Sequence, residues 1–179
     1  RDFVSPQLER KMVIKDNFLN KKELKALQDL MLGPTFSWCY NDGVLGPNDQ
    51  NRFQFTHLLF ANCRVTSATY DFFLRLFQDK LHAKCFIRIK ANLNPRSHKP
   101  IKQGFHTDYS NNKTAIFYLN TNNGYTEFEN GKIVESVANR MVEFDSNLKH
   151  QSVTCTDNKI RVVINFNYYK MRNDEEIPS

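Results

Sequence analysis

The stretch Gly-Phe-His-Thr-Asp-Tyr at residues 104–109 places a histidine and an aspartate two positions apart between aromatic residues. In an extended strand alternate side chains share a face, so a strand at residues 105–109 predicts that His106 and Asp108 point the same way. An imidazole and a carboxylate suit a borderline divalent metal ion, and a second histidine completes the two-histidine, one-carboxylate set of non-haem iron sites. One such pair is a weak signal, because short motifs recur by chance.

His150 is the single histidine that follows Asp108 in the chain, which makes it the candidate for the third ligand. Beyond it, residues 159–166 read Lys-Ile-Arg-Val-Val-Ile-Asn-Phe and alternate as a strand, with Arg161 on the same face as Val163 and Asn165. A guanidinium in such a strand either reaches solvent or meets an anion, because an unpaired buried charge is very costly.

Length and composition favour a single domain. The chain has 179 residues, 40% of them hydrophobic, and 15 are Phe, which is enough for a full core. We predict one domain over residues 1–179, with a helical and strand support region at 1–84, a β core at 85–169 and a tail at 170–179.

The cysteines and the apolar runs indicate the compartment. Cys39, Cys63, Cys85 and Cys155 are far apart and form no Cys-x-x-Cys pair, so we expect reduced, mostly buried thiols and no zinc knuckle. The apolar runs are shorter than a membrane span needs. We therefore expect a soluble, cytoplasmic protein with no membrane partner.

The pattern of the chain predicts a mostly β fold with N-terminal helices. Helices are expected at 16–32, where Asn20 and Glu23 form a capping box, and at 67–81. Trp38, in an expected strand at 36–40, is assigned to the core rather than to a stacking platform. Further strands are expected at 53–60, 85–93, 105–109, 113–120, 125–129, 132–137, 140–144, 151–156 and 159–169, with a type I′ turn at Asn130-Gly131. So many short strands suit a jelly roll of the cupin kind.

The net charge of +6 is spread along the chain, with a modest basic cluster at Arg96, His98, Lys99 and Lys102. The cluster is either a solvated loop or a rim that attracts an acidic partner. If His106 lies in an active-site mouth, this loop flanks it.

These motifs, taken in order, resemble a known family. The motifs His106-x-Asp108, Phe-Tyr-Leu-Asn at 117–120, Gly-Tyr-Thr-Glu-Phe at 124–128, His150 and Arg161 are similar to those of the 2-oxoglutarate- and Fe(II)-dependent oxygenases, in particular the prolyl 4-hydroxylase-like branch. Residues 36–40 and 88–92 resemble small bacteriophage and marine bacterial members of the group. The resemblance covers residues 85–169. It implies a double-stranded β-helix, a jelly roll of the cupin kind, braced by the two helices.

The resemblance also implies the ligands. His106, Asp108 and His150 would bind Fe(II), and Arg161 with Tyr118 would hold the distal carboxylate of 2-oxoglutarate. Asn92 is a candidate cosubstrate contact or an exposed amide. Dioxygen would be consumed, and ascorbate is a cofactor that such enzymes can require. The chain departs from the family at Asn123-Gly124-Tyr125, where Gly-Gly-Glu is usual.

Three functions from different classes follow. The first is an oxygenase that hydroxylates a prolyl or other residue of a peptide or protein. The second applies the same chemistry to a nucleobase or small molecule, which the basic loop mildly supports. The third is a cupin-like module that binds metal without turnover, which Arg161 disfavours. The loops at 41–52 and 94–104 are expected to contact the substrate and to act as lids. The sequence does not indicate an oligomeric state.

Overall fold

The computed structural model describes residues 12–44 and 52–171. Its elements in chain order are β1 (Val13–Lys15), α1 (Lys21–Met31), β2 (Cys39–Asn41), β3 (Gln54–Ala61), β4 (Arg64–Val65), α2 (Tyr70–Leu81), β5 (Ala83–Pro95), β6 (Lys113–Tyr118), β7 (Tyr125–Phe128), β8 (Ile133–Glu135), β9 (Arg140–Asp145), β10 (His150–Val153) and β11 (Ile160–Lys170).

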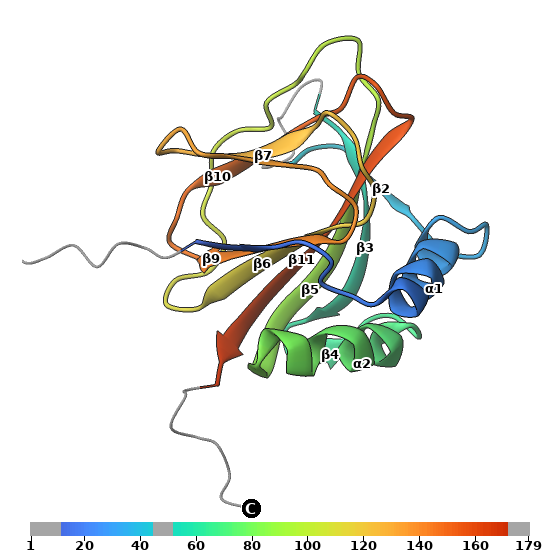
Figure 1. Cartoon of the computed structure of the whole chain (residues 1–179), viewed down its shortest axis with the longest axis vertical. Coiled ribbons are helices and arrows are strands. Elements are labelled where there is room, and N and C mark those ends of the chain that lie inside the picture. The colour runs from blue at the N-terminus through green and yellow to red at the C-terminus, as the bar shows by residue number, and fades with distance from the viewer. Residues whose placement is uncertain (1–11, 45–51, 172–179) are drawn as a thin grey trace, which may run out of the picture.

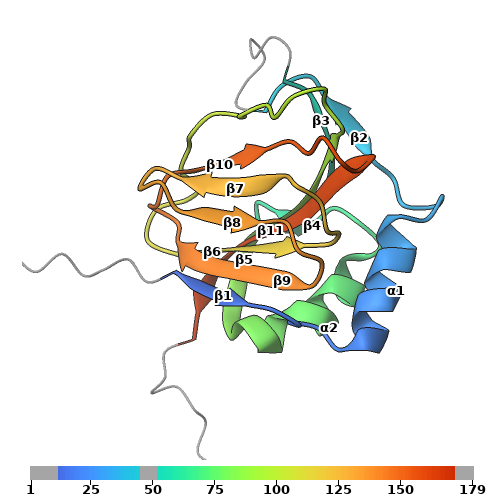
Figure 2. The same cartoon turned by 45° about the horizontal axis from the view of Figure 1, so that its top comes forward.

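Two antiparallel sheets face each other. The main sheet has the order β1-β9-β6-β11-β5-β3-β2, with β4 at the edge of β3, and the minor sheet has the order β10-β7-β8. The minor sheet stands opposite one face of the main sheet, whereas both helices cover the other face (Figures 1 and 2). The predicted fold class, a jelly roll braced by two helices, is confirmed.

The alternation of β11 explains how the main sheet serves two layers. Val162, Ile164 and Phe166 pack in the core under the helices, while Val163 packs in a second core against the minor sheet. The side chains of one strand alternate between its faces, so every second residue of β11 points into the space between the sheets. Arg161 and Asn165 lie on that inner face.

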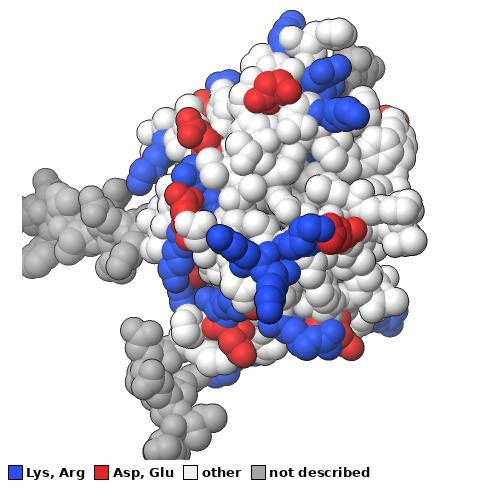
Figure 3. Space-filling model, turned by 45° about the vertical axis from the view of Figure 1, so that its right-hand side comes forward, with Lys and Arg blue, Asp and Glu red and all other residues white. Residues whose placement is uncertain are grey.

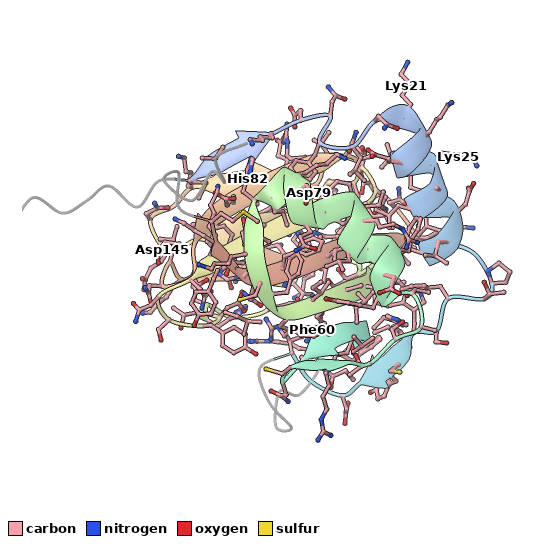
Figure 4. All side chains as sticks on the ribbon, turned by 90° about the horizontal axis from the view of Figure 1, so that it is seen from below. Lys21, Lys25, Phe60, Asp79, His82 and Asp145 are labelled. Carbon is pink, nitrogen blue, oxygen red and sulfur yellow. The ribbon has the colours of Figure 1, made fainter. Side chains whose placement is uncertain are left out.

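Helix α1 begins directly after the predicted capping box, at Lys21 rather than at residue 16, and it ends at Met31, one residue before the predicted end. The Asn20 side chain accepts a hydrogen bond from the Glu23 backbone N–H, and the Glu23 carboxylate accepts one from the Asn20 N–H. The helix buries Leu27 and Met31, while Lys21 and Lys25 project away from the sheet (Figure 4). Trp38 packs against this core, and its indole N–H donates to the Met31 carbonyl, which confirms its assignment to the core.

Several predictions about local structure are wrong. Residues 105–109 form no strand and keep one isolated bridge at His106. The strand expected at 36–40 is the shorter β2, and β1 and β4 were not expected. Strands of two or three residues, such as β1, β2 and β4, are too short to show a periodic pattern in the sequence. The predicted loop at 41–52 lies largely outside the described residues, so its role as a lid stays a prediction.

The Asn130-Gly131 turn also differs from expectation. A type I′ turn needs positive φ at both residues, but only Gly131 has it, with φ of 83°. The Gly131 N–H donates to the Phe128 carbonyl, and the Phe128 N–H donates to the Lys132 carbonyl. This is a three-residue loop that ends in a left-handed glycine, the next commonest hairpin.

The cysteines are free, as expected, but they are not mostly buried. Cys155 is buried, whereas Cys39, Cys63 and Cys85 are exposed. None of the helices in the described ranges is long and apolar enough to cross a membrane.

Candidate active site

Three metal-ligating side chains meet between the two sheets. The ligand atoms of His106, Asp108 and His150 lie within 4.8 Å of one another. The Nε2 atom of each histidine is 4.0 Å from an oxygen of Asp108, too far for a hydrogen bond. The structure therefore brings together the three predicted ligands with space for an ion between their donor atoms.

The two imidazoles are oriented by hydrogen bonds on their far sides. Nδ1 of His106 is 3.2 Å from the Gly104 carbonyl, and Nδ1 of His150 is 3.1 Å from the Leu148 carbonyl. A carbonyl can only accept, so each Nδ1 carries the proton and each Nε2 lone pair faces the site. This is the arrangement that metal-binding histidines use.

Burial keeps His150 neutral. The side chain lies beside the rings of Phe128 and Phe144, and its burial lowers its pKa from 6.5 to about 4. A metal ligand must be deprotonated at Nε2, and His150 meets that requirement at neutral pH. Two neutral imidazoles and one carboxylate fit Fe(II).

Asp108 is held by three donors. Arg88 Nη2 lies 3.0 Å from Oδ1, while Asn167 Nδ2 and Thr114 Oγ1 approach Oδ2 at 2.9 and 3.2 Å. Burial raises the pKa of Asp108, but the charge of Arg88 and the Asn167 hydrogen bond act against burial, and the pKa is lowered. The carboxylate is thus ionised and fixed in orientation.

Arg161 is buried at a second polar centre, with 1% of its surface exposed. Its Nε donates to Ser136 Oγ at 2.9 Å, and Nη1 donates to Ser152 Oγ at 2.7 Å. A third bond joins Nη2 to Thr126 Oγ1 at 3.3 Å. No carboxylate among the described residues pairs with Arg161, and burial lowers its pKa. Neutral hydroxyls do not balance the charge, so the site lacks an anion.

A cavity of about 490 Å³ contains both centres, a size typical of small-molecule sites. Its described walls come from β3, β5, β6, β7, β10 and β11, together with Val44 and the segment 103–109. Three of the wall's amide side chains have a buried atom with no hydrogen-bond partner: Asn92 Oδ1, Asn94 Nδ2 and Asn165 Oδ1. Such atoms are rare in folded proteins and indicate a ligand or water.

Tyr118 lies behind Arg161. Its ring centre is 5.7 Å from the guanidinium carbon, and its hydroxyl donates to Thr126 Oγ1 at 2.8 Å. Thr126 therefore accepts from both Tyr118 and Arg161. Tyr118 fixes the position of that threonine, and its own contact with a cosubstrate stays a prediction.

Sequence reasoning missed three residues of the cavity wall. Arg88, Lys90 and Asn94 lie on β5, on the same face as Asn92, and line the cavity with it. Asn94 is the cross-strand neighbour of Arg161. The alternation of β5 could have identified all three, because residues two apart share a face.

Other predicted features lie outside the cavity wall. In the basic loop, Lys102 pairs with Glu127 at 2.8 Å, and Lys99 is exposed. His57 bonds the Ser37 carbonyl and the Ser67 hydroxyl, which is a structural role. Residue Gln103, at the end of the loop, does line the cavity, so the loop flanks the site as expected.

Comparison with known proteins identifies the fold. A prolyl-4-hydroxylase of Pseudomonas putida is similar over 92% of this chain and 95% of its own, with 15% identity and a TM-score of 0.62. A 2OG-Fe(II) oxygenase family oxidoreductase of Burkholderia pseudomallei covers 89% and 86%, with 12% identity and a TM-score of 0.63. A prolyl hydroxylase of Trichoplax adhaerens, solved with a hypoxia inducible factor peptide fragment, covers 90% and 84%, with 16% identity and a TM-score of 0.61.

No protein-family model and no curated protein matches the sequence. The fold is that of the 2OG-Fe(II) oxygenases, and of their prolyl hydroxylases in particular. The relationship expected from the sequence motifs is therefore confirmed at the level of the fold. Function must be argued from the site, because one fold supports many reactions.

Proposed function

We propose that the chain is an Fe(II)- and 2-oxoglutarate-dependent dioxygenase that hydroxylates a prolyl or other residue of a peptide or protein. The observation that carries the proposal is Arg161, a buried guanidinium without a carboxylate partner, in the same cavity as the His106, Asp108 and His150 triad. A metal-binding module that needs no cosubstrate has no use for this costly charge.

The residues divide into two groups by role. His106 Nε2, His150 Nε2 and an oxygen of Asp108 would hold Fe(II) and leave positions for other ligands. When bound, iron with 2-oxoglutarate and dioxygen supplies the oxidation, in which the keto acid becomes succinate and CO2 and one oxygen atom enters a substrate C–H bond.

Arg161 would bind the distal carboxylate of the cosubstrate. A guanidinium has five N–H donors, and Ser136, Ser152 and Thr126 occupy three of them. The two that remain can meet a carboxylate, which binds a guanidinium best through paired bonds. Asn94 Nδ2, an unpaired donor on the neighbouring strand, supports the same placement, and Asn92 is a second candidate contact through its Nδ2 donor.

The substrate class is the finer part of the proposal. The structural neighbours include prolyl hydroxylases, one of them solved with a peptide. Nucleic acid would need a basic tract along a phosphate backbone. On the face shown in Figure 3, blue Lys and Arg atoms adjoin red Asp and Glu atoms in several places. A peptide is therefore proposed on the basis of the structural neighbours.

Succinate release tests the proposal. The Fe(II)-loaded protein is incubated with 2-oxoglutarate and dioxygen, with and without ascorbate, against proline-containing peptides, single-stranded DNA and RNA, and free amino acids. We expect peptides to stimulate turnover and to gain the mass of one oxygen atom. A salt series on the nucleic-acid samples separates electrostatic binding from turnover.

Two results would contradict the proposal. Stimulation by a nucleic acid or a free amino acid alone, with an oxidised product, would move the substrate to the second class. Failure to bind 2-oxoglutarate with Fe(II) present would leave a metal-binding module.

A further inference from the structure

Lys90 is a cation of the cavity wall that neither the proposed metal site nor the proposed cosubstrate site uses. It lies on β5 between Arg88 and Asn92, on the face that points into the space between the sheets. Its side chain is partly buried, and burial with the charge of Arg88 lowers its pKa. A partly buried ammonium is retained at a cost unless an anion compensates it.

Two other charges of the wall, Arg88 and Asp108, pair with each other, and Arg161 is assigned to the cosubstrate. The described residues of the wall include three cations, Arg88, Lys90 and Arg161, and one carboxylate, Asp108. Arg88 is 3.0 Å from Asp108 and 5.3 Å from the centre of the Tyr109 ring. No ion pair joins Lys90 to any described residue. Among the described residues of the wall, Lys90 is therefore the cation that neither a carboxylate of the chain nor the proposed cosubstrate site accounts for.

This inference rests on the proposed function. If that function holds, 2-oxoglutarate does not supply the anion that would balance Lys90. Of the two carboxylates of 2-oxoglutarate, one is assigned to Arg161 and the other to the metal. Lys90 is the cross-strand neighbour of Asn165, four positions from Arg161 along β11. At about 3.3 Å per residue this separates the two cations by roughly 13 Å of strand.

We propose that Lys90 selects the substrate by pairing with its carboxylate, so that the preferred peptide has Asp or Glu beside the residue that is oxidised. Two unpartnered amide oxygens lie in the same wall, on Asn92 and Asn165. These acceptors need N–H or O–H donors, which 2-oxoglutarate lacks as a dianion and a peptide backbone provides. A single ammonium between such amides suits a carboxylate of a peptide.

The test is a binding measurement near the metal. Mn(II) replaces Fe(II), 2-oxoglutarate is added, and the probes are the capped tripeptides Ac-Asp-Pro-Asp-NH2 and Ac-Asn-Pro-Asn-NH2. Paramagnetic broadening of the peptide proton signals reports binding close to Mn(II). We expect the acidic tripeptide to bind at least about tenfold more tightly, the size of one charge-assisted hydrogen bond.

Three variants separate Lys90 from general electrostatics. Lys90→Met should remove the preference for the acidic tripeptide, and Lys90→Arg should keep most of it. Lys99→Met, which makes the same change in charge on the exposed loop, should leave the preference intact. All three should bind 2-oxoglutarate as the wild type does, and circular dichroism verifies that they are folded.

The outcomes separate this inference from the proposed function. If Mn(II) or 2-oxoglutarate fails to bind, the proposed function fails, and Lys90 loses its basis with it. If both bind but the two tripeptides bind equally, or neither binds, only the role of Lys90 is overturned. A tenfold loss of 2-oxoglutarate affinity in Lys90→Met would make Lys90 a cosubstrate contact and overturn the inference as well.

Discussion

His106 and His150 pair with each other through their own backbones. The N–H of each donates to the carbonyl of the other at 3.0 Å, and the ring centres lie 4.7 Å apart. Residue 106 belongs to no strand, so this isolated bridge is what places one metal ligand beside the other. The backbone holds the pair whichever side chains it carries.

The first prediction follows from that bridge. His106→Ala, Asp108→Ala and His150→Ala should each abolish binding of Fe(II) or Mn(II), because three ligands are the minimum for this site. The two histidine variants should remain folded, since the bridge does not involve the imidazoles. Isothermal titration with Mn(II) and circular dichroism check both points. His57→Ala is the control, and full metal binding by His150→Ala would show that the triad is wrong.

The second prediction concerns Arg161. Arg161→Gln should weaken 2-oxoglutarate binding by about a hundredfold or more, because truncating a buried charged pair costs about 3–5 kcal/mol. The 2-oxoglutarate affinity of Arg161→Lys should lie between those of the wild type and Arg161→Gln, because an ammonium cannot form the paired hydrogen bonds of a planar guanidinium. The anaerobic visible band of the Fe(II) chelate measures the affinity. Arg140→Gln is the control, because Arg140 pairs with Asp16 at 2.6 Å, outside the cavity.

The same site predicts a thermal shift. A ligand at a hundred times its Kd stabilises by about 2.7 kcal/mol, which is roughly 5–10 °C of Tm for a chain of this size. We expect 2-oxoglutarate with Mn(II) to raise the Tm of the wild type and of Arg140→Gln by this amount. A full shift in Arg161→Gln would move the carboxylate site elsewhere.

How far the sequence predicts this site depends on the range of the interactions involved. The alternation of β11 correctly places Arg161 on the inner face, because periodicity is local. The position of His106 is not local, since the His150 backbone fixes it across the chain, and a strand was wrongly expected there. Likewise, no local pattern shows that Arg161 lacks a carboxylate, because that depends on what β7, β8 and β10 bring against it.

The asparagines of β5 show a different limit of prediction from sequence. The sequence identified Asn92 as a candidate, yet Asn94 is the residue opposite Arg161. Only the register of β5 against β11 distinguishes the two, and register depends on pairing rather than on composition.

The fourth prediction is a pH dependence of the metal-free protein. The pKa of His150 is 6.5 unfolded and about 4 folded, so the unfolded chain binds the proton first as pH falls. The contribution of His150 to the free energy of unfolding is therefore fully present above pH 6.5. It is lost as the pH falls from 6.5 to 4, by about 3 kcal/mol in total. Asp108, whose folded pKa is also lowered, adds a loss of the same sign at lower pH.

Urea unfolding from pH 7.5 to 4.5 measures this loss. His150→Gln cannot take up the proton and should show a flatter profile across the same range. An equal slope in wild type and His150→Gln would assign the loss to other groups.

The last prediction concerns Gly124, which packs against the Arg161 side chain. A Cβ at this position would lie 2.6 Å from Arg161 Cδ and 2.8 Å from the Val153 carbonyl oxygen. The backbone of β10 cannot move far without shifting His150, so Gly124→Ala must displace the guanidinium. A displaced guanidinium would lose one of its charged hydrogen bonds to 2-oxoglutarate. The affinity for 2-oxoglutarate should therefore fall by about tenfold or more.

Gly131→Ala is the matched control for Gly124→Ala. Nothing lies within 4 Å of a Cβ at Gly131, but its φ of 83° strains any other residue, so alanine there should lower the free energy of unfolding by about 1–2 kcal/mol. Gly131 does not touch the cavity, and the 2-oxoglutarate affinity of this variant should stay unchanged. We expect Gly131→Ala to lose stability but keep its 2-oxoglutarate affinity, and Gly124→Ala to lose 2-oxoglutarate affinity. This pair of results would show that the loss at Gly124 comes from the carboxylate site and not from general backbone strain. Unchanged 2-oxoglutarate affinity in a folded Gly124→Ala protein would show that Arg161 does not bind the cosubstrate from this position.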